Sequence, residues 1–158
     1  MLFPKALVAI LALPGVVIGL IPTFLILNDP WRGSGLSAGY LLFLVGGVTL
    51  FLSVRAFYIS GKGTLAPWAP PVTIVRVGIY RTVLSPMYIG VLICLFGLSL
   101  SYGSPLVGVY TLLMAVIFHL NLIYIEEPKL ASMFGNAWRQ YATEVPRWLP
   151  RIRRVSSP

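Results

Sequence analysis

Residues 82–125 form a run of 44 positions without a single Asp, Glu, Lys or Arg, and this run constrains the fold more than any other feature. A helix needs about 20 apolar residues to cross a bilayer, so the run is long enough for two crossings. The turn-forming residues 101–105 (SYGSP) divide it. Because only helices satisfy their backbone polar groups within one segment in lipid, we expect a helical hairpin with spans over residues 82–100 and 105–125.

The remaining composition also indicates a membrane protein. Of the 158 residues, 58% are hydrophobic and 10% are charged, whereas a soluble domain has roughly 25% charged residues. Residues 6–27 and 36–59 supply two further apolar segments of spanning length. We therefore predict one all-α integral membrane domain over residues 1–158, with four transmembrane helices of which the last two form the hairpin.

The positive charges predict how the chain is oriented. Residues 60–81 carry Lys62, Arg76 and Arg81, and six more Lys and Arg residues follow the fourth predicted span. Because Lys and Arg near span ends stay cytoplasmic, we expect both of these segments and both termini in the cytoplasm. Anionic membrane lipids explain the net charge of +8, so no nucleic-acid partner is expected.

The segment after the fourth span has helical periodicity. Pro128 suits the first turn of a new helix, which would run to about residue 144. Its apolar positions recur at spacings of three and four: Leu130, Met133, Phe134, Ala137, Trp138 and Tyr141. This pattern predicts a cytoplasmic amphipathic helix that either anchors on the membrane surface or covers a cavity between the spans. Residues 151–158 would form a basic tail.

Glu126 and Glu127 are two of only four acidic residues, and they stand where the uncharged run ends. Adjacent carboxylates at the edge of hydrocarbon lose hydration and repel each other, so cationic partners or a polar cavity must lie nearby. Alternatively, they interact favourably with the dipole of the next helix. His119, two helical turns earlier, would line the same cavity or hydrogen-bond to a neighbouring span. Because His119 has no second candidate metal ligand near it in the sequence, we assign no metal site.

Several blocks together resemble a known family. Residues 78–90 (GIYRTVLSPMYIG), then Glu126-Glu127, then residues 134–135 (FG) and 145–150 (VPRWLP) resemble the isoprenylcysteine carboxyl methyltransferase family and its phospholipid methyltransferase relatives. Residues 63–68 (GTLAPW) are similar to small bacterial members. The family pattern has an arginine, followed by histidine or asparagine, where this chain has Leu84 and Ser85.

The resemblance implies an S-adenosylmethionine-dependent methyltransferase of the bacterial inner membrane. Its cofactor pocket would face the cytoplasm, between the last spans and residues 126–150. Glutamates suit the cofactor's ammonium, arginines its carboxylate, and aromatic faces its sulfonium and adenine. By this resemblance the catalytic residues are Arg81, Glu126, Glu127 and Arg147. The implied cofactor-binding residues are Tyr80, Arg81, Ser85, Pro86, Met87, Tyr88, His119, Glu126, Glu127, Tyr141, Arg147 and Trp148.

The methyl acceptor is expected to be lipid-like or prenylated and to enter from the bilayer. Carboxyl O-methylation is favoured, with amine N-methylation as the alternative. An amine must lose a proton, for which Glu126 or Glu127 would be the base. Two other hypotheses stay open, namely an inactive relative acting as a small membrane scaffold and a sterol-reductase-like enzyme that uses a nicotinamide. The sequence does not predict the oligomeric state.

Overall fold

The computed structural model describes residues 14–61 and 73–150, and over these residues the chain is all-helical, without a strand. The predictions for residues 1–13, for residues 62–72 of the cytoplasmic loop and for the tail at 151–158 lie outside the described residues. The helices are η1 (Gly15–Leu20), α2 (Ile21–Leu27), α3 (Ala38–Gly61), η2 (Gly78–Arg81), α4 (Pro86–Tyr102), α5 (Pro105–Asn121), η3 (Leu122–Glu126), α6 (Glu127–Phe134) and α7 (Asn136–Glu144).

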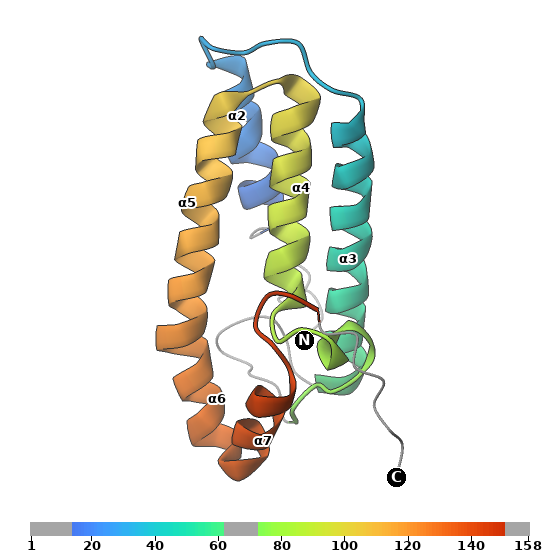
Figure 1. Cartoon of the computed structure of the whole chain (residues 1–158), viewed down its shortest axis with the longest axis vertical. Coiled ribbons are helices and arrows are strands. Elements are labelled where there is room, and N and C mark those ends of the chain that lie inside the picture. The colour runs from blue at the N-terminus through green and yellow to red at the C-terminus, as the bar shows by residue number, and fades with distance from the viewer. Residues whose placement is uncertain (1–13, 62–72, 151–158) are drawn as a thin grey trace, which may run out of the picture.

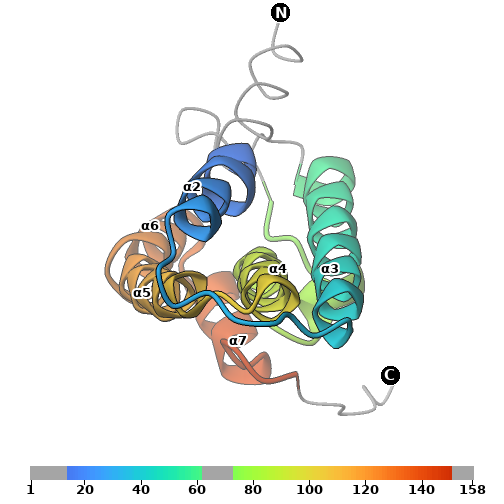
Figure 2. The same cartoon turned by 90° about the horizontal axis from the view of Figure 1, so that it is seen from above.

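Helix α4 lies at the centre of the bundle, with α3 on one side and α5 on the other (Figure 1). Seen from above, α2 lies on a third side of α4 (Figure 2), and α7 lies beyond the lower end of α4, next to α6 (Figure 1). The predicted hairpin of α4 and α5 is confirmed. Gly103 ends α4 in the left-handed conformation (φ 55°), and the side chain of Ser104 caps α5 by accepting the N–H of Val107.

Helices α3 and α4 pack with their backbones in direct contact. The contact uses Gly39 and Gly46 of α3 and Gly90 and Gly97 of α4. A Cβ atom on Gly46 would lie 2.6 Å from the backbone nitrogen of Cys94, and one on Gly97 would lie 2.6 Å from that of Phe43. Small residues permit this close approach, which supplies the packing energy that binds helices together in lipid.

Among residues 14–61 and 73–150, two helices are long and apolar enough to cross a membrane, over Ala38–Phe57 and Pro105–Phe134. Their outer faces expose large apolar side chains, including Leu41, Leu44, Val48 and Phe51 of α3 and Val109, Leu112, Leu113 and Val116 of α5. The apolar helices Gly15–Leu27 and Pro86–Tyr102 are shorter. The described part of the chain is thus all-helical and has two helices that could span a membrane, and the full set of four spans remains a prediction.

The start of the third predicted span needs a correction. Helix α4 begins at Pro86 and not at residue 82. Ser85, which precedes it, has a non-helical backbone (φ −128°, ψ 62°), because the ring of a proline disfavours the helical region for the residue before it. Proline itself suits the first helical position, since the N–H that it lacks has no partner there.

The end of the fourth predicted span was also wrong. The helix does not stop at residue 125 but continues through η3 and α6 to Phe134. Pro128 lies inside this continuous helix, where it provides no N–H donor. The turn before it widens into the π-helix η3, in which the N–H of Glu127 bonds to the carbonyl of Leu122. The chain then breaks at Gly135 (φ 53°), so the predicted amphipathic helix is two helices, α6 and α7.

Candidate functional site

An apolar cluster joins the C-terminal helices to the loop before α4. Its buried members are Leu84, Trp138, Tyr141 and Val145, and Ile74, Leu130, Ala131, Phe134 and Ala142 pack against them. The backbone N–H of Leu84 also donates to the carbonyl of Pro146 over 2.9 Å. Leu84 therefore fills a packing position where the family pattern has an arginine. Because α7 buries its apolar face against the chain itself, the structure favours a covering role over a membrane-surface anchor.

Tyr80 and Tyr141 hold this C-terminal part against η2. The hydroxyl of Tyr141 donates to the carbonyl of Tyr80 over 2.6 Å. Burial raises the pKa of Tyr141 to about 12, against the opposing charge of Arg76, so the hydroxyl stays protonated and remains a donor. The Arg76 guanidinium lies 5.1 Å from the ring centre of Tyr141 and donates to the carbonyl of Ala137 over 2.7 Å. Both tyrosines thus make structural contacts.

Arg81 is not brought to the glutamates. Its side chain is exposed, and its Nε atom donates to the carbonyl of Arg76 over 3.1 Å. In residues 14–61 and 73–150 it forms no ion pair with Glu126 or Glu127. Ser85 and Pro86 are buried at the start of α4 and Met87 is half-buried, directly before Tyr88 in the chain. The catalytic and cofactor-binding roles of these residues remain predictions.

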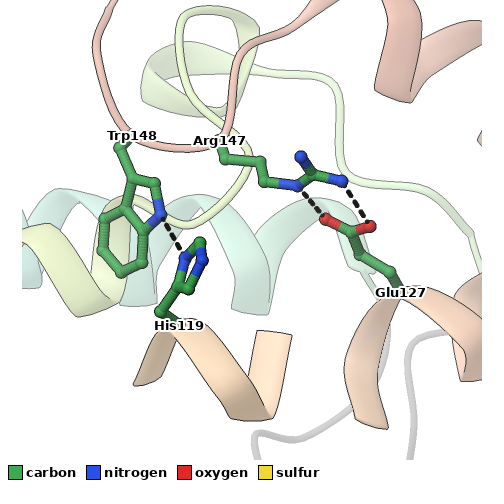
Figure 3. A network of polar contacts seen from close by, with 4 residues as sticks. All are labelled: His119, Glu127, Arg147 and Trp148. Carbon is green, nitrogen blue, oxygen red and sulfur yellow. Dashed lines mark hydrogen bonds and ion pairs between the residues drawn. The ribbon is translucent and has the colours of Figure 1, made fainter. Parts of the chain in front are cut away.

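Residues 145–150 form a non-helical segment with bends, the C-terminal strap, which carries one half of a polar network (Figure 3). Arg147 pairs with both carboxylate oxygens of Glu127, at 2.6 Å from Nε and 3.0 Å from a terminal nitrogen. This fork-to-fork geometry is the strong form of an ion pair, and its hydrogen bonding raises the pKa of Arg147. The side chain of Arg147 is 50% exposed and that of Glu127 is 18% exposed, so a ligand in solution can reach the pair.

The next strap residue makes the second contact of this network. Trp148 donates its indole N–H to Nδ1 of His119 over 3.1 Å, and the two rings lie 6.1 Å apart. Figure 3 shows Trp148 and His119 beside Arg147 and Glu127. Four of the residues predicted from the sequence therefore lie together.

Glu126 faces a different set of partners from its neighbour. The hydroxyl of Tyr88 donates to its Oε1 atom, and Nδ2 of Asn121 donates both to that oxygen and to the Tyr88 hydroxyl, each over 2.8 Å. The Tyr88 ring stacks on Phe118, with centres 4.3 Å apart and planes 10° apart. Tyr88 and Glu126 were predicted from the sequence, whereas Asn121 and Phe118 were missed.

The two glutamates are therefore differently placed carboxylates on one continuous helix. Because the helix runs unbroken from Pro105 to Phe134, neither glutamate lies at a free helix N-terminus, and the dipole explanation for the pair is wrong. Glu127 offers an accessible carboxylate beside a guanidinium, suited to binding a ligand that carries both charges. Glu126 offers a half-buried carboxylate held by donors, suited to binding or accepting a proton.

Comparison with protein families gives a match over much of the chain. A family model described as phospholipid methyltransferase matches residues 35–137, which is more than half of the 158 residues. It covers α3 to the start of α7, including the two glutamates, and ends before the C-terminal strap. Neither the curated proteins nor the solved structures contain a match to this chain. On the strength of the family match, the chain belongs to the phospholipid methyltransferase family, whose members are membrane methyltransferases.

Proposed function

We propose that this protein transfers a methyl group from S-adenosylmethionine to a lipid-like acceptor, at a site on the cytoplasmic side of the membrane. The observation that carries the proposal is the accessible Glu127–Arg147 pair beside Trp148, within a chain of a methyltransferase family. When bound, S-adenosylmethionine supplies a methyl group activated by a sulfonium. The positive charges at residues 60–81 and after residue 128 support a cytoplasmic site with both termini on the same side.

The residues of the network fit the charged end of this cofactor. An amino-acid group carries one ammonium and one carboxylate, and Glu127 and Arg147 provide the complementary charges side by side. Because solvent reaches the pair, Arg147 and Glu127 are able to exchange their contact with each other for contacts with the ligand's carboxylate and ammonium. Trp148 adds an aromatic face, which attracts a sulfonium or stacks on adenine.

An apolar groove of about 280 Å³ supports an acceptor that enters from the bilayer. It lies between α4 and α5, with one residue of α3 at its edge, and is lined by Leu42, Ile89, Leu92, Ile93, Phe96, Thr111, Leu112 and Ala115. The groove begins at Ile89, one residue from Tyr88, whose hydroxyl binds Glu126. A hydrocarbon chain in this groove would place its polar head beside Glu126.

Glu126 favours an amine as the acceptor over the carboxylate that the resemblance favoured. A carboxylate acceptor beside Glu126 would meet a like charge, whereas an ammonium group would meet a complementary one. An amine must also lose a proton before it attacks a methyl group, and Glu126 is placed to take it. The description of the family, phospholipid methyltransferase, supports the same choice.

Cofactor binding tests the first part of the proposal. Calorimetry on detergent-solubilised protein should show that S-adenosylmethionine binds, and that Glu127→Gln weakens binding about 10- to 150-fold, the equivalent of about 1.5–3 kcal/mol for a charge-assisted hydrogen bond. Glu144→Gln is the matched control, because Glu144 is exposed on α7 and bonds only to Gln140 within the described residues.

Absence of S-adenosylmethionine binding by the wild-type protein would overturn the proposal. Binding of a reduced nicotinamide would then favour a reductase-like enzyme, and binding of neither would favour a scaffold.

Methyl transfer from labelled S-adenosylmethionine in vesicles tests the acceptor. Vesicles that contain phosphatidylethanolamine should become labelled and a prenylated cysteine analogue should not. Labelling of the cysteine analogue alone would reject the amine acceptor and keep the methyltransferase.

A further inference from the structure

Two side chains converge on a single oxygen of Glu126. Tyr88 donates its hydroxyl to Oε1, and Asn121 donates to the same Oε1 over 2.8 Å. Asn121 also donates to the Tyr88 hydroxyl over 2.8 Å, so the three groups form a closed triangle. Within the part of the chain that the structure describes, no hydrogen bond reaches Oε2 of Glu126. One oxygen is fixed, and the other is left for a ligand.

The π-helix η3 brings Asn121 and Glu126 together. In a regular α-helix, residues five positions apart point about 140° away from each other around the axis. A π-turn bonds each residue to the one five positions on, which places such residues on one face. The N–H of Glu127 bonds to Leu122 in this manner, and Asn121 and Glu126 have the same separation. The wide turn that accommodates Pro128 therefore creates the contact.

We propose that Asn121 is a positioning residue that fixes Oε1 of Glu126 and so directs Oε2 to accept a proton from the acceptor amine. This inference rests on the proposed function. Without Asn121 the carboxylate would keep only the Tyr88 donor, and it would rotate about its last bond. Two donors on Oε1 also favour the ionised form of a carboxylate, which is the form that accepts a proton.

The proton transfer balances without any further reactant. An N–H bond of the acceptor ammonium breaks, its electron pair stays on nitrogen, and the proton forms an O–H bond at Oε2. Glu126 becomes neutral and later releases the proton to water. The titratable and charged groups around Glu126 are Tyr88 and Tyr80 on the α4 side and Glu127 and Lys129 on its own helix. Within the described residues none of these four groups hydrogen-bonds to Oε2.

The test compares Asn121→Ala with the wild-type full chain in lipid vesicles that contain phosphatidylethanolamine. We expect kcat to fall at least tenfold while the KM for S-adenosylmethionine stays within twofold, because the Glu127–Arg147 pair does not contact Asn121. The acidic limb of the kcat–pH profile should move up by about one pH unit, since a lost donor disfavours the carboxylate. Asn121→Gln keeps a donor and should recover part of kcat.

Asn136→Ala is the matched control, because Asn136 is an exposed residue at the start of α7, and it should leave the kcat and the pH profile unchanged. An unchanged kcat and pH profile in Asn121→Ala would overturn the inference and leave the proposed function standing. If that variant fails to fold, Asn121→Leu decides, because leucine is similar in size and has no donor, and an acidic limb at the wild-type position in that variant then counts against a positioning role. An inactive wild-type protein would instead reject the proposed function itself.

Discussion

The α3–α4 interface and the C-terminal part of the site are held together in opposite ways. At Gly46 and Gly97, the two backbones touch and leave no room for a single methyl group. At the strap, Arg147 and Trp148 attach to Glu127 and His119 through the tips of long side chains. The first interface admits one arrangement because of its shape. The second depends on hydrogen bonds that a ligand is able to replace.

This difference explains where binding is expected in the molecule. Direct backbone contact resists any displacement, because interiors packed this closely have no free volume to absorb it. Regions held by exposed polar contacts open at a lower free-energy cost, and ligand-binding segments are drawn from such regions. The rigid α3–α4 pair thus supports α4, which carries Tyr88, while the strap supplies the adaptable partners.

The largest expected effect is from Gly46→Leu, which tests whether the α3–α4 contact is as tight as described. A side chain here would overlap the backbone of Cys94 and Gly90, so the helices must separate. We expect a loss of about 3 kcal/mol in the free energy of unfolding, the upper range for overpacking. Thermal unfolding in detergent measures it.

Gly47→Leu provides the control for this prediction. Gly47 is the next residue on α3, and a Cβ atom there would have nothing within 4 Å. Leucine is also a better helix former than glycine, so stability should be unchanged or slightly higher. Equal losses in the two variants would show that the effect comes from the helix and not from its interface with α4.

A smaller effect is expected from Leu84→Ala, which probes the apolar cluster under the strap. Leu84 is 9% exposed and packs with Trp138 and Tyr141, so truncation should cost about 2–3 kcal/mol. The strap should also detach more readily, because the Leu84 side chain belongs to the same buried cluster as Val145 of the strap. Leu149→Ala, at an 80% exposed strap position, should change neither stability nor cofactor affinity. If Leu84→Ala is less stable but binds S-adenosylmethionine with unchanged affinity, the apolar cluster does not contribute to cofactor binding.

The hairpin was predictable because a single local cause determines it. A long uncharged run demands helices, and Gly103 and Pro105 at its middle demand a turn, so α4 and α5 form as expected. Glu127 and His119 were identified because charged and polar side chains beside hydrocarbon are costly unless they find partners. Arg147 and Trp148 were identified through the family resemblance. Which of them pair with each other depends on the path of the strap, which the sequence does not specify.

Pro128 shows why the rest of the site was not predictable. A proline after a long apolar segment is equally compatible with the start of a new helix and with a widened turn inside a continuous one. Only contacts with α4, above all those of Tyr88, distinguish the two. Asn121 was missed for the same reason. Its contact with Glu126 joins residues five positions apart, which lie on different faces of a regular α-helix. Leu84 was seen only as a departure from the family pattern, because its packing partners lie far along the chain.

The smallest expected effect concerns Asp29, in the loop at the end of the bundle away from the strap. Burial tends to raise the pKa of Asp29, but the hydrogen bonds from the Ser104 hydroxyl and from the backbone N–H groups of Leu106 and Trp31 outweigh it and lower the pKa below its usual value. A carboxyl whose pKa is lower in the folded than in the unfolded state contributes stability above its unfolded pKa of about 3.9. That contribution is lost as the pH falls through the folded pKa.

Asp29→Asn therefore tests whether a single carboxylate fastens the start of α5 to the loop, in contrast to the glycine-packed interface next to it. The variant should have a slightly lower Tm than the wild type at neutral pH, by less than Leu84→Ala. Its Tm should then fall less steeply than that of the wild type below about pH 4, because the titrating group is gone. Thermal unfolding between about pH 7 and pH 3 measures both. Parallel curves of Tm against pH for the two proteins below about pH 4 would show that the Ser104 and Leu106 contacts do not depend on the charge of Asp29. The loop end would then be held by its packing, like the α3–α4 interface.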